Sequence, residues 1–213
     1  MKKRTVLIPI TVLVFAIAVY ILGWSTFFTV SSVEIKGANS ILTSTIEPGQ
    51  KLARVEPRAI AAEFERLDWV KSADVSRNWI NGKVTIMLTQ RTPIAIYNGR
   101  VIDADGFSFI IRDQNSSGLP RIQAPTIESA ITATAFLTSL SAEIVDAVAL
   151  VKVQSGDAYV LEVKQGADII EIHWGQAVEN VLKIKVYKAL IAQPENSKIR
   201  RIDLSAPHAP IVK

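Results

Sequence analysis

Few side chains in this sequence have the types and spacing needed for chemistry. The 213 residues include two histidines, His173 and His208, and no cysteine. A histidine-rich metal centre is therefore excluded, and the sequence lacks H-E-x-x-H, G-x-S-x-G, S-x-x-K and a Gly-rich phosphate loop. A Ser, a His and an Asp could still meet in space, but no spacing indicates it. We expect no catalytic, cofactor-binding or metal-binding residues and predict that the protein is not an enzyme.

Two short motifs look chemical at first sight. Asp103-x-Asp105-Gly106 begins like a calcium loop, but the closing bidentate Glu is replaced by Arg112, so we interpret the motif as a hairpin turn. Asn115-Ser-Ser117 matches a glycosylation sequon, and it lies in a polar stretch that we interpret as a loop. Neither motif predicts a reaction or a bound ion.

The strongest pattern is an apolar run near the start of the chain. No charged residue lies between Val6 and Trp24, and a helix of that length spans about 28 Å, the thickness of a bilayer's hydrocarbon core. Basic residues at positions 2–4 precede the run, which predicts a short cytosolic tail and places the rest of the chain across the membrane. We therefore expect a single transmembrane helix within residues 1–28.

A cleaved signal peptide is the alternative interpretation of this run. Ala16-Ile17-Ala18 fits a small-x-small cleavage pattern, but the chain stays apolar from Val19 to Trp24, which favours an uncleaved anchor. Removing the basic residues 2–4 leaves 21 Lys and Arg against 20 Asp and Glu, a net charge of about +1. A nearly neutral extracytoplasmic part gives no basis for nucleic-acid binding.

The first sixty residues after the anchor predict a small α+β unit. Val33 and Ile35 alternate with polar residues as in a half-buried strand. Asn39 then suits the N-cap of a short helix with Ile41, Leu42 and Ile46 on one face, and a second helix follows Pro57 with Ile60, Phe64 and Leu67 on one face. Two strands, 70–77 and 84–89, are joined by an Asn81-Gly82 turn. Two helices should therefore pack on one face of a three-stranded sheet.

The second half predicts a mixed, β-rich domain with flanking helices. A hairpin is expected at 94–102, a strand at 107–111, a helix at 128–140 and three strands at 147–153, 159–163 and 168–174. A helix over 176–191 should carry Val178, Val181, Leu182 and Leu190 on its apolar side, with Lys183, Lys185 and Lys188 in solvent. Arg200–Leu204 is the last clear strand, before a tail that ends in apolar Ile211-Val212.

The segment from Leu67 to Trp79, LDWVKSADVSRNW, resembles the FtsQ/DivIB family of bacterial cell-division proteins. The similarity continues through Gln90-Arg91-Thr-Pro93-Ile-Ala95, Asp103-Ala-Asp-Gly106 and the closing Ile202-Asp203-Leu204. This resemblance implies a POTRA domain at 29–92, with the order β-α-α-β-β, and a β domain at 93–213. It also implies a non-enzymatic scaffold in the bacterial cell membrane at the division septum.

The resemblance further implies partners and the residues that bind them. The partners would be other divisome membrane proteins and the small coiled-coil subunits FtsB/DivIC and FtsL, which in the family attach partly by adding a strand to the edge of the β domain. An open sheet edge supplies the N–H and C=O groups for such pairing. Here that edge maps to the last strand and the tail, namely to Arg200, Ile202, Leu204, Ala206, His208, Ile211 and Val212. We expect no later element to cover the strand at 200–204.

Two points of this assignment stay open. Pro207 and Pro210 lack N–H donors, so the tail either pairs over a short stretch or protects the edge from pairing. In the family the second POTRA strand is tied to recruitment, which points to Val75 and Arg77, although Val75 suits the core equally well. The main alternative function is a membrane-anchored, POTRA-bearing chaperone or secretion subunit that binds extended polypeptide. A membrane-anchored hydrolase is a third hypothesis.

Overall fold

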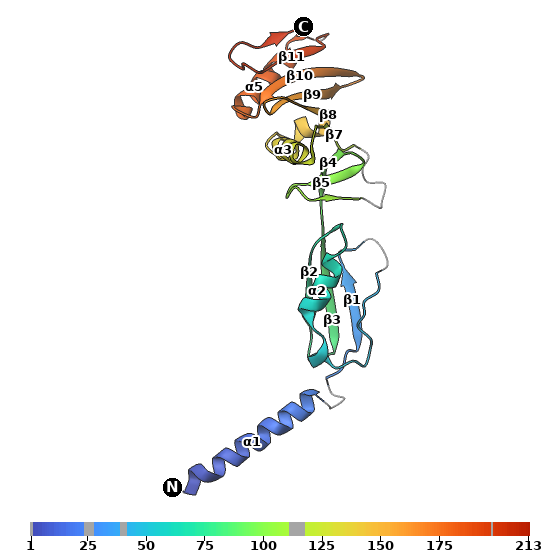
Figure 1. Ribbon diagram of the computed structural model, residues 1–213, viewed down its shortest axis with the longest axis vertical. Coiled ribbons are helices and arrows are strands. Elements are labelled where there is room, and N and C mark those ends of the chain that lie inside the picture. The colour runs from blue at the N-terminus through green and yellow to red at the C-terminus, as the bar shows by residue number, and fades with distance from the viewer. Residues whose placement is uncertain (1, 24–27, 39–41, 111–117, 197) are drawn as a thin grey trace. The chain divides into compact units, whose positions relative to one another are not determined.

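Helix α1 (Lys2–Gly23) opens the chain. In the computed structural model the described residues are 2–23, 28–38, 42–110, 118–196 and 198–213 (Figure 1). The sequence predicts a membrane-spanning helix at 6–24, of which Trp24 lies outside the described residues. Among the residues that are described, no helix has both the length and the apolar character needed to cross a membrane.

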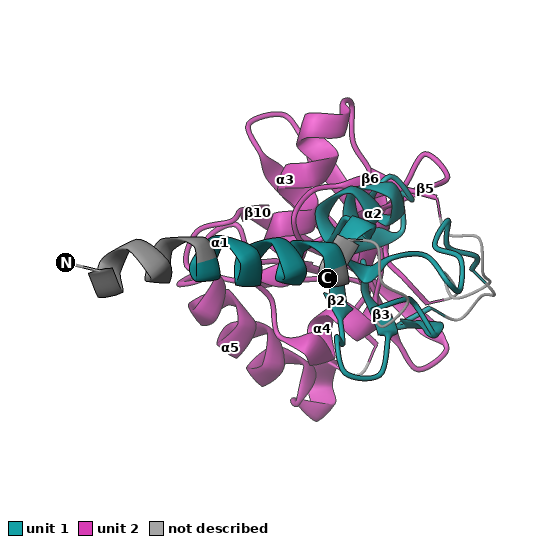
Figure 2. Cartoon of the chain, turned by 90° about the horizontal axis from the view of Figure 1, so that it is seen from below, with its two compact units in different colours: residues 1–91 teal, residues 92–213 magenta. Residues whose placement is uncertain are grey.

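The chain forms two compact units, residues 1–91 and 92–213, coloured separately in Figure 2. Each has its own hydrophobic core, and the two sets of core residues do not overlap. Both units combine strands with helices, in agreement with the predicted α+β class.

The first unit contains a three-stranded sheet in the order β1-β3-β2. Strand β1 (Ser32–Lys36) runs parallel to β3 (Lys83–Gln90), and β2 (Val70–Arg77) pairs antiparallel with β3. Helix α2 (Pro57–Glu65) buries Ile60 and Phe64 in the core, as their spacing predicts. The predicted strands of this unit and the turn between β2 and β3 are confirmed.

The first predicted helix of this unit is wrong in its described part. Leu42 to Ile46 is not helical, while Asn39 and Ile41 lie outside the described residues. The intervening Thr43-Ser44-Thr45 is poor in helix formers, and the backbone N–H of Ile46 donates to the Ser44 hydroxyl at 3.4 Å. Such local side-chain bonds compete with a helix. A single 3₁₀ turn, η1 (Leu52–Arg54), is the helical element that follows before α2.

The second unit contains a nine-stranded mixed sheet in the order β12-β11-β10-β9-β8-β7-β4-β5-β6. Its first strands are β4 (Pro93–Tyr97), β5 (Arg100–Asp103), β6 (Ser108–Phe109) and β7 (Arg121–Gln123). The remaining strands are β8 (Val148–Gln154), β9 (Ala158–Gln165), β10 (Asp168–Gln176), β11 (Arg201–Asp203) and β12 (Ile211–Val212). The predicted hairpin at 94–102 and the three predicted strands between 147 and 174 are confirmed.

Three α-helices contribute to the core of this unit: α3 (Ile127–Thr138), α4 (Ala142–Ala147) and α5 (Asn180–Ile191), and a 3₁₀ turn η2 (Pro194–Asn196) follows α5. Helix α3 confirms the prediction at 128–140. Helix α4 was not predicted because its six residues are too short for a period to show. The strand predicted at 107–111 is reduced to β6, because Phe107 and Ile110 are not in a strand; Ile111 lies outside the described residues.

Candidate protein-binding site at the C-terminal sheet edge

The end of the chain forms one edge of the second unit's sheet. Strand β11 runs parallel to β10, with Ile202 opposite Ile172, and β12 then pairs antiparallel with β11, with Val212 opposite Ile202. The expectation that no later element covers the strand at 200–204 is therefore wrong. The edge is covered because the chain turns before Pro210, and this turn lets the short apolar Ile211-Val212 return along β11. The outermost strand is β12.

The register decides which backbone groups β12 presents at this edge. Lys213 donates its N–H to the Arg201 carbonyl at 2.9 Å and accepts from the Arg201 N–H at 3.0 Å. In an antiparallel pair the neighbouring residue points its own backbone groups the other way, so Val212 directs its N–H and C=O away from β11. Pro210, two residues earlier, has no N–H to donate. A partner strand would therefore pair with β12 over a short stretch centred on Val212.

The tail that leads to β12 is fixed by local contacts. The Asp203 carboxylate accepts hydrogen bonds from the N–H and the hydroxyl of Ser205, at 2.9 and 2.6 Å. Pro207 is buried, and His208 lies 3.7 Å from the Glu179 carboxylate that precedes α5. The tail is thus held against the domain, and β12 is presented as a preformed edge.

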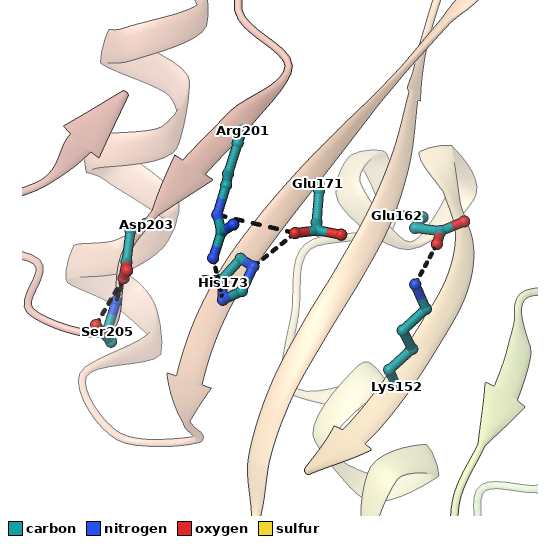
Figure 3. A network of polar contacts seen from close by, with 7 residues as sticks. All are labelled: Lys152, Glu162, Glu171, His173, Arg201, Asp203 and Ser205. Atoms are coloured by element: carbon teal, nitrogen blue, oxygen red, sulfur yellow. Dashed lines mark hydrogen bonds and ion pairs between the residues drawn. The ribbon is translucent and has the colours of Figure 1, made fainter. Parts of the chain in front are cut away.

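A row of polar contacts extends across β8 to β11 beside this edge (Figure 3). His173 lies 2.6 Å from Glu171, Arg201 lies 3.8 Å from the same carboxylate, and Lys152 pairs with Glu162 at 2.6 Å. The hydrogen bond from His173, together with the charges of His173, Arg201 and Lys152, lowers the pKa of Glu171 despite its partial burial. The Arg201 contacts link β11 to β10 and the Lys152–Glu162 pair links β8 to β9, whereas Glu171 and His173 both lie in β10.

The predicted binding residues divide into two groups in the structure. Ile202 and Leu204 are fully buried in the core of the unit, so their side chains support the edge from behind. The others are exposed: Arg200, Ala206, His208, Ile211 and Val212. Arg200 lies 3.3 Å from the Asp168 carboxylate at the start of β10. The exposed residues of the predicted site therefore lie in the tail, in β12 and at Arg200 before β11.

Sequence analysis missed the residue that joins α5 to the end of β10. Lys183, predicted to lie in solvent, is completely buried, and its Nζ donates to the carbonyls of Trp174 and Gln176 at 2.7 and 2.9 Å. Val178 and Val181, predicted on the apolar side, are instead exposed. Ile184 and Tyr187 follow Lys183 on the core side of α5. Their spacing was the feature of the sequence that could have indicated which face of the helix is buried. The long apolar stem of Lys183 takes the place of a hydrophobic residue.

The burial of Lys183 should make the free energy of unfolding depend on pH in the alkaline range. Burial lowers the pKa of Lys183 below its ordinary value of 10.5. Just below that pH the folded chain therefore binds fewer protons than the unfolded chain, so the free energy of unfolding rises with pH. We expect this rise, measured by urea unfolding at pH values just below 10.5, to be weaker in Lys183→Met. Lys185→Met, at an exposed position of the same helix, is the control, and equal slopes in all three chains would contradict the assignment.

The candidate recruitment residues of the first unit are both engaged within it. Val75 is buried in the core, and the Arg77 guanidinium donates to the carbonyls of Leu52 and Val55 at 3.0 and 2.7 Å. The same guanidinium lies 5.3 Å from the centre of the Trp79 ring. A partner that approaches β2, an outer strand of the sheet, would meet Asp74 and Ser76, which are exposed.

The Asp103 motif forms the turn that its sequence predicts. The carboxylate accepts hydrogen bonds from the N–H groups of Asp105 and Phe107, at 3.0 and 2.8 Å. Within the described part of the chain, no group of three His, Asp or Glu side chains is arranged to hold a metal ion. Arg112 and the sequon at 115–117 lie outside the described residues.

Comparison with known proteins agrees with this two-unit organisation. Residues 28–91 match the POTRA domain, FtsQ-type, and residues 94–205 match the family "Cell division protein FtsQ/DivIB, C-terminal". The chain is also 30% identical over 112 residues to "Cell division protein FtsQ" of Salinibacter ruber, an alignment that covers 49% of this chain and 42% of the relative. The chain thus spans about two fifths of the length of that curated relative. Because the C-terminal family alone covers more than half of the chain, this protein belongs to the FtsQ/DivIB family of cell-division proteins.

Proposed function

We propose that this chain is a non-enzymatic scaffold of the divisome. It links early division proteins to a subcomplex of FtsB/DivIC-like and FtsL-like coiled-coil proteins at the septum. The observation that carries the proposal is the edge at β12, where Val212 directs backbone groups outward and the side chains of Ile211 and Val212 are exposed. Pairing with an added strand satisfies such groups, and the exposed Ile211 and Val212 give the pairing an apolar contact.

We further propose that α1 anchors the scaffold in the bacterial cell membrane, with the N-terminus in the cytoplasm. The charge-free sequence from Val6 to Trp24 and the basic residues before it support this topology. Between Ile10 and Tyr20 the large apolar side chains of α1 are mostly exposed, Phe15 by 70% and Leu13 by 60%. A helix with apolar side chains on every face is stable where lipid or other helices surround it.

The proposed role is tested by depletion of the protein in its bacterial host, followed by microscopy. We expect long filaments with unformed septa, because the late coiled-coil proteins would no longer be linked to the early ones. Expression of the full chain from a plasmid is the control and should restore division. Normal division together with defects in protein export would instead indicate a chaperone or secretion subunit.

A further inference from the structure

One end of the first unit is built around the point where the chain arrives from α1. The N–H of Ser31 donates to the Gly82 carbonyl at 2.8 Å, and the Ser31 hydroxyl donates to the Asn81 carbonyl at 2.7 Å. The Phe28 and Trp79 rings meet edge to face, with their centres 6.0 Å apart. The turn between β2 and β3, residues 78–82, is therefore fastened to residues 28–31.

This turn holds an apolar side chain out in solvent. Ile80 is 98% exposed and the neighbouring Trp79 is 37% exposed. The Asn78 side chain accepts hydrogen bonds from the N–H groups of Ile80 and Asn81, at 3.0 and 3.3 Å, and the N–H of Gly82 donates to the Asn78 carbonyl at 2.9 Å. A turn closed by three hydrogen bonds is rigid, so the exposure of Ile80 is imposed by the local structure.

The length of the connecting chain limits how far this turn lies from α1. Helix α1 ends at Gly23, and four residues, 24–27, separate it from Phe28. Even a fully extended chain spans only roughly 18 Å over these five peptide links. The headgroup region on each side of a bilayer is several ångströms deep, and Trp and aliphatic side chains favour its boundary with the acyl chains. A helix that ends at the membrane surface would keep the turn beside that surface.

We propose that the 78–82 turn is a second membrane contact, in which Ile80 and Trp79 enter the headgroup–acyl boundary of the bilayer next to the end of α1. The proposal rests on the membrane anchor proposed above. With two contacts, one through α1 and one through the turn, the first unit is held at the lipid surface in a defined orientation.

The absence of cysteine from the sequence allows a direct test. The full chain carrying Ile80→Cys is labelled with the environment-sensitive dye NBD and reconstituted into phosphatidylethanolamine–phosphatidylglycerol vesicles. The matched control is Asp68→Cys, an exposed position before β2, and the eight residues of β2 carry it about 25 Å from the turn. We expect a blue-shifted emission and strong quenching by lipids with nitroxides near the headgroup for the dye at position 80, with neither effect at position 68.

The outcomes separate the turn from the anchor. Vesicle flotation first reports whether the chain is anchored, and a chain that does not float refutes the proposed anchor. If the chain floats but the dyes at positions 80 and 68 are quenched equally, the turn does not touch the membrane and the proposal fails. A dye at position 80 that is shielded from aqueous iodide but not quenched by the lipid nitroxides would also overturn it, because another copy of the chain would then cover the turn.

Discussion

Removal of residues 205–213 is expected to weaken binding of the full chain to FtsB/DivIC-like and FtsL-like proteins by at least about 100-fold. The deletion removes β12, which is the outermost strand, and with it the outward backbone groups of Val212. It also removes the exposed side chains of Ile211 and Val212, the apolar part of the same edge. Pull-down of the coiled-coil proteins with the purified full chain measures the effect, and undiminished binding would refute this placement of the interface.

A deletion also disturbs the domain, because the tail contacts β11 and contains the buried Pro207. Val212→Pro is a finer test, since it removes an N–H that points away from β11 and leaves the bonds between Lys213 and Arg201 in place. One hydrogen bond is worth roughly 0.5–1.5 kcal/mol, so we expect the dissociation constant to rise about 2- to 13-fold. The midpoint of urea unfolding should not change.

Val212→Ala is the matched control for this substitution. It keeps the N–H and removes part of the apolar side chain, so the two variants separate backbone pairing from apolar contact. If Pro and Ala weaken binding equally, the partner contacts the side chain of Val212 and does not add a strand. If neither variant has an effect while the deletion does, the binding surface lies in the tail before β12, around Ala206 and His208.

Local patterns were sufficient to predict most of the fold. The Asn81-Gly82 turn and the alternation of Val84, Ile86 and Leu88 gave β2 and β3, because a hairpin depends on neighbours in the sequence. Helix α2 followed from Pro57 and the spacing of Ile60 and Phe64. These elements agree with their tertiary surroundings, so propensity and burial lead to the same structure.

The parts that were missed depend on contacts between distant residues. Strand β12 has two residues and exists because β11 is there to pair with it, so no period could reveal it. The core face of α5 was predicted only in part. Leu190 packs against the core and Lys185 and Lys188 are exposed, as predicted. Lys183 was assumed to be in solvent, whereas two carbonyls at the end of β10 accept hydrogen bonds from its buried Nζ. The sequence therefore pointed to the residues of the candidate edge, but not to the strand that Ile211 and Val212 form or to the way the domain supports it.

Trp174→Ala is expected to lower the free energy of unfolding of the second unit by about 3–5 kcal/mol. Trp174 is completely buried at the end of β10, where its ring meets Phe136 of α3 edge to face with the centres 5.8 Å apart. Its Nε1 donates to the Asn180 side chain at 2.9 Å, which ties β10 to the first residue of α5. One residue thus joins the sheet to two helices, and its truncation leaves a large cavity and an unpaired amide oxygen.

Trp174→Phe separates the two contributions. Phenylalanine keeps an aromatic ring against Phe136 but loses the hydrogen bond to Asn180, so we expect a smaller loss, of which the bond accounts for roughly 1 kcal/mol. Urea unfolding followed by circular dichroism is the measurement, since tryptophan fluorescence changes with the substitution itself. Because the two units have separate cores, Trp69→Ala in the first unit should leave the second unit's transition in place.

Trp174→Ala should also affect the binding edge at β12, although Trp174 lies in the core. Strand β11 is held on one side by β10, with Ile202 opposite Ile172, and β12 is held in turn by β11. Lys183 bonds to the carbonyl of Trp174 itself, so a collapse around the cavity displaces α5 together with the end of β10. We therefore expect Trp174→Ala to weaken partner binding at 37 °C more than at 15 °C, while Trp174→Phe binds normally at both. An equal loss of partner binding at both temperatures, with the unit still folded, would contradict the expectation that Trp174 affects the edge through the stability of the core.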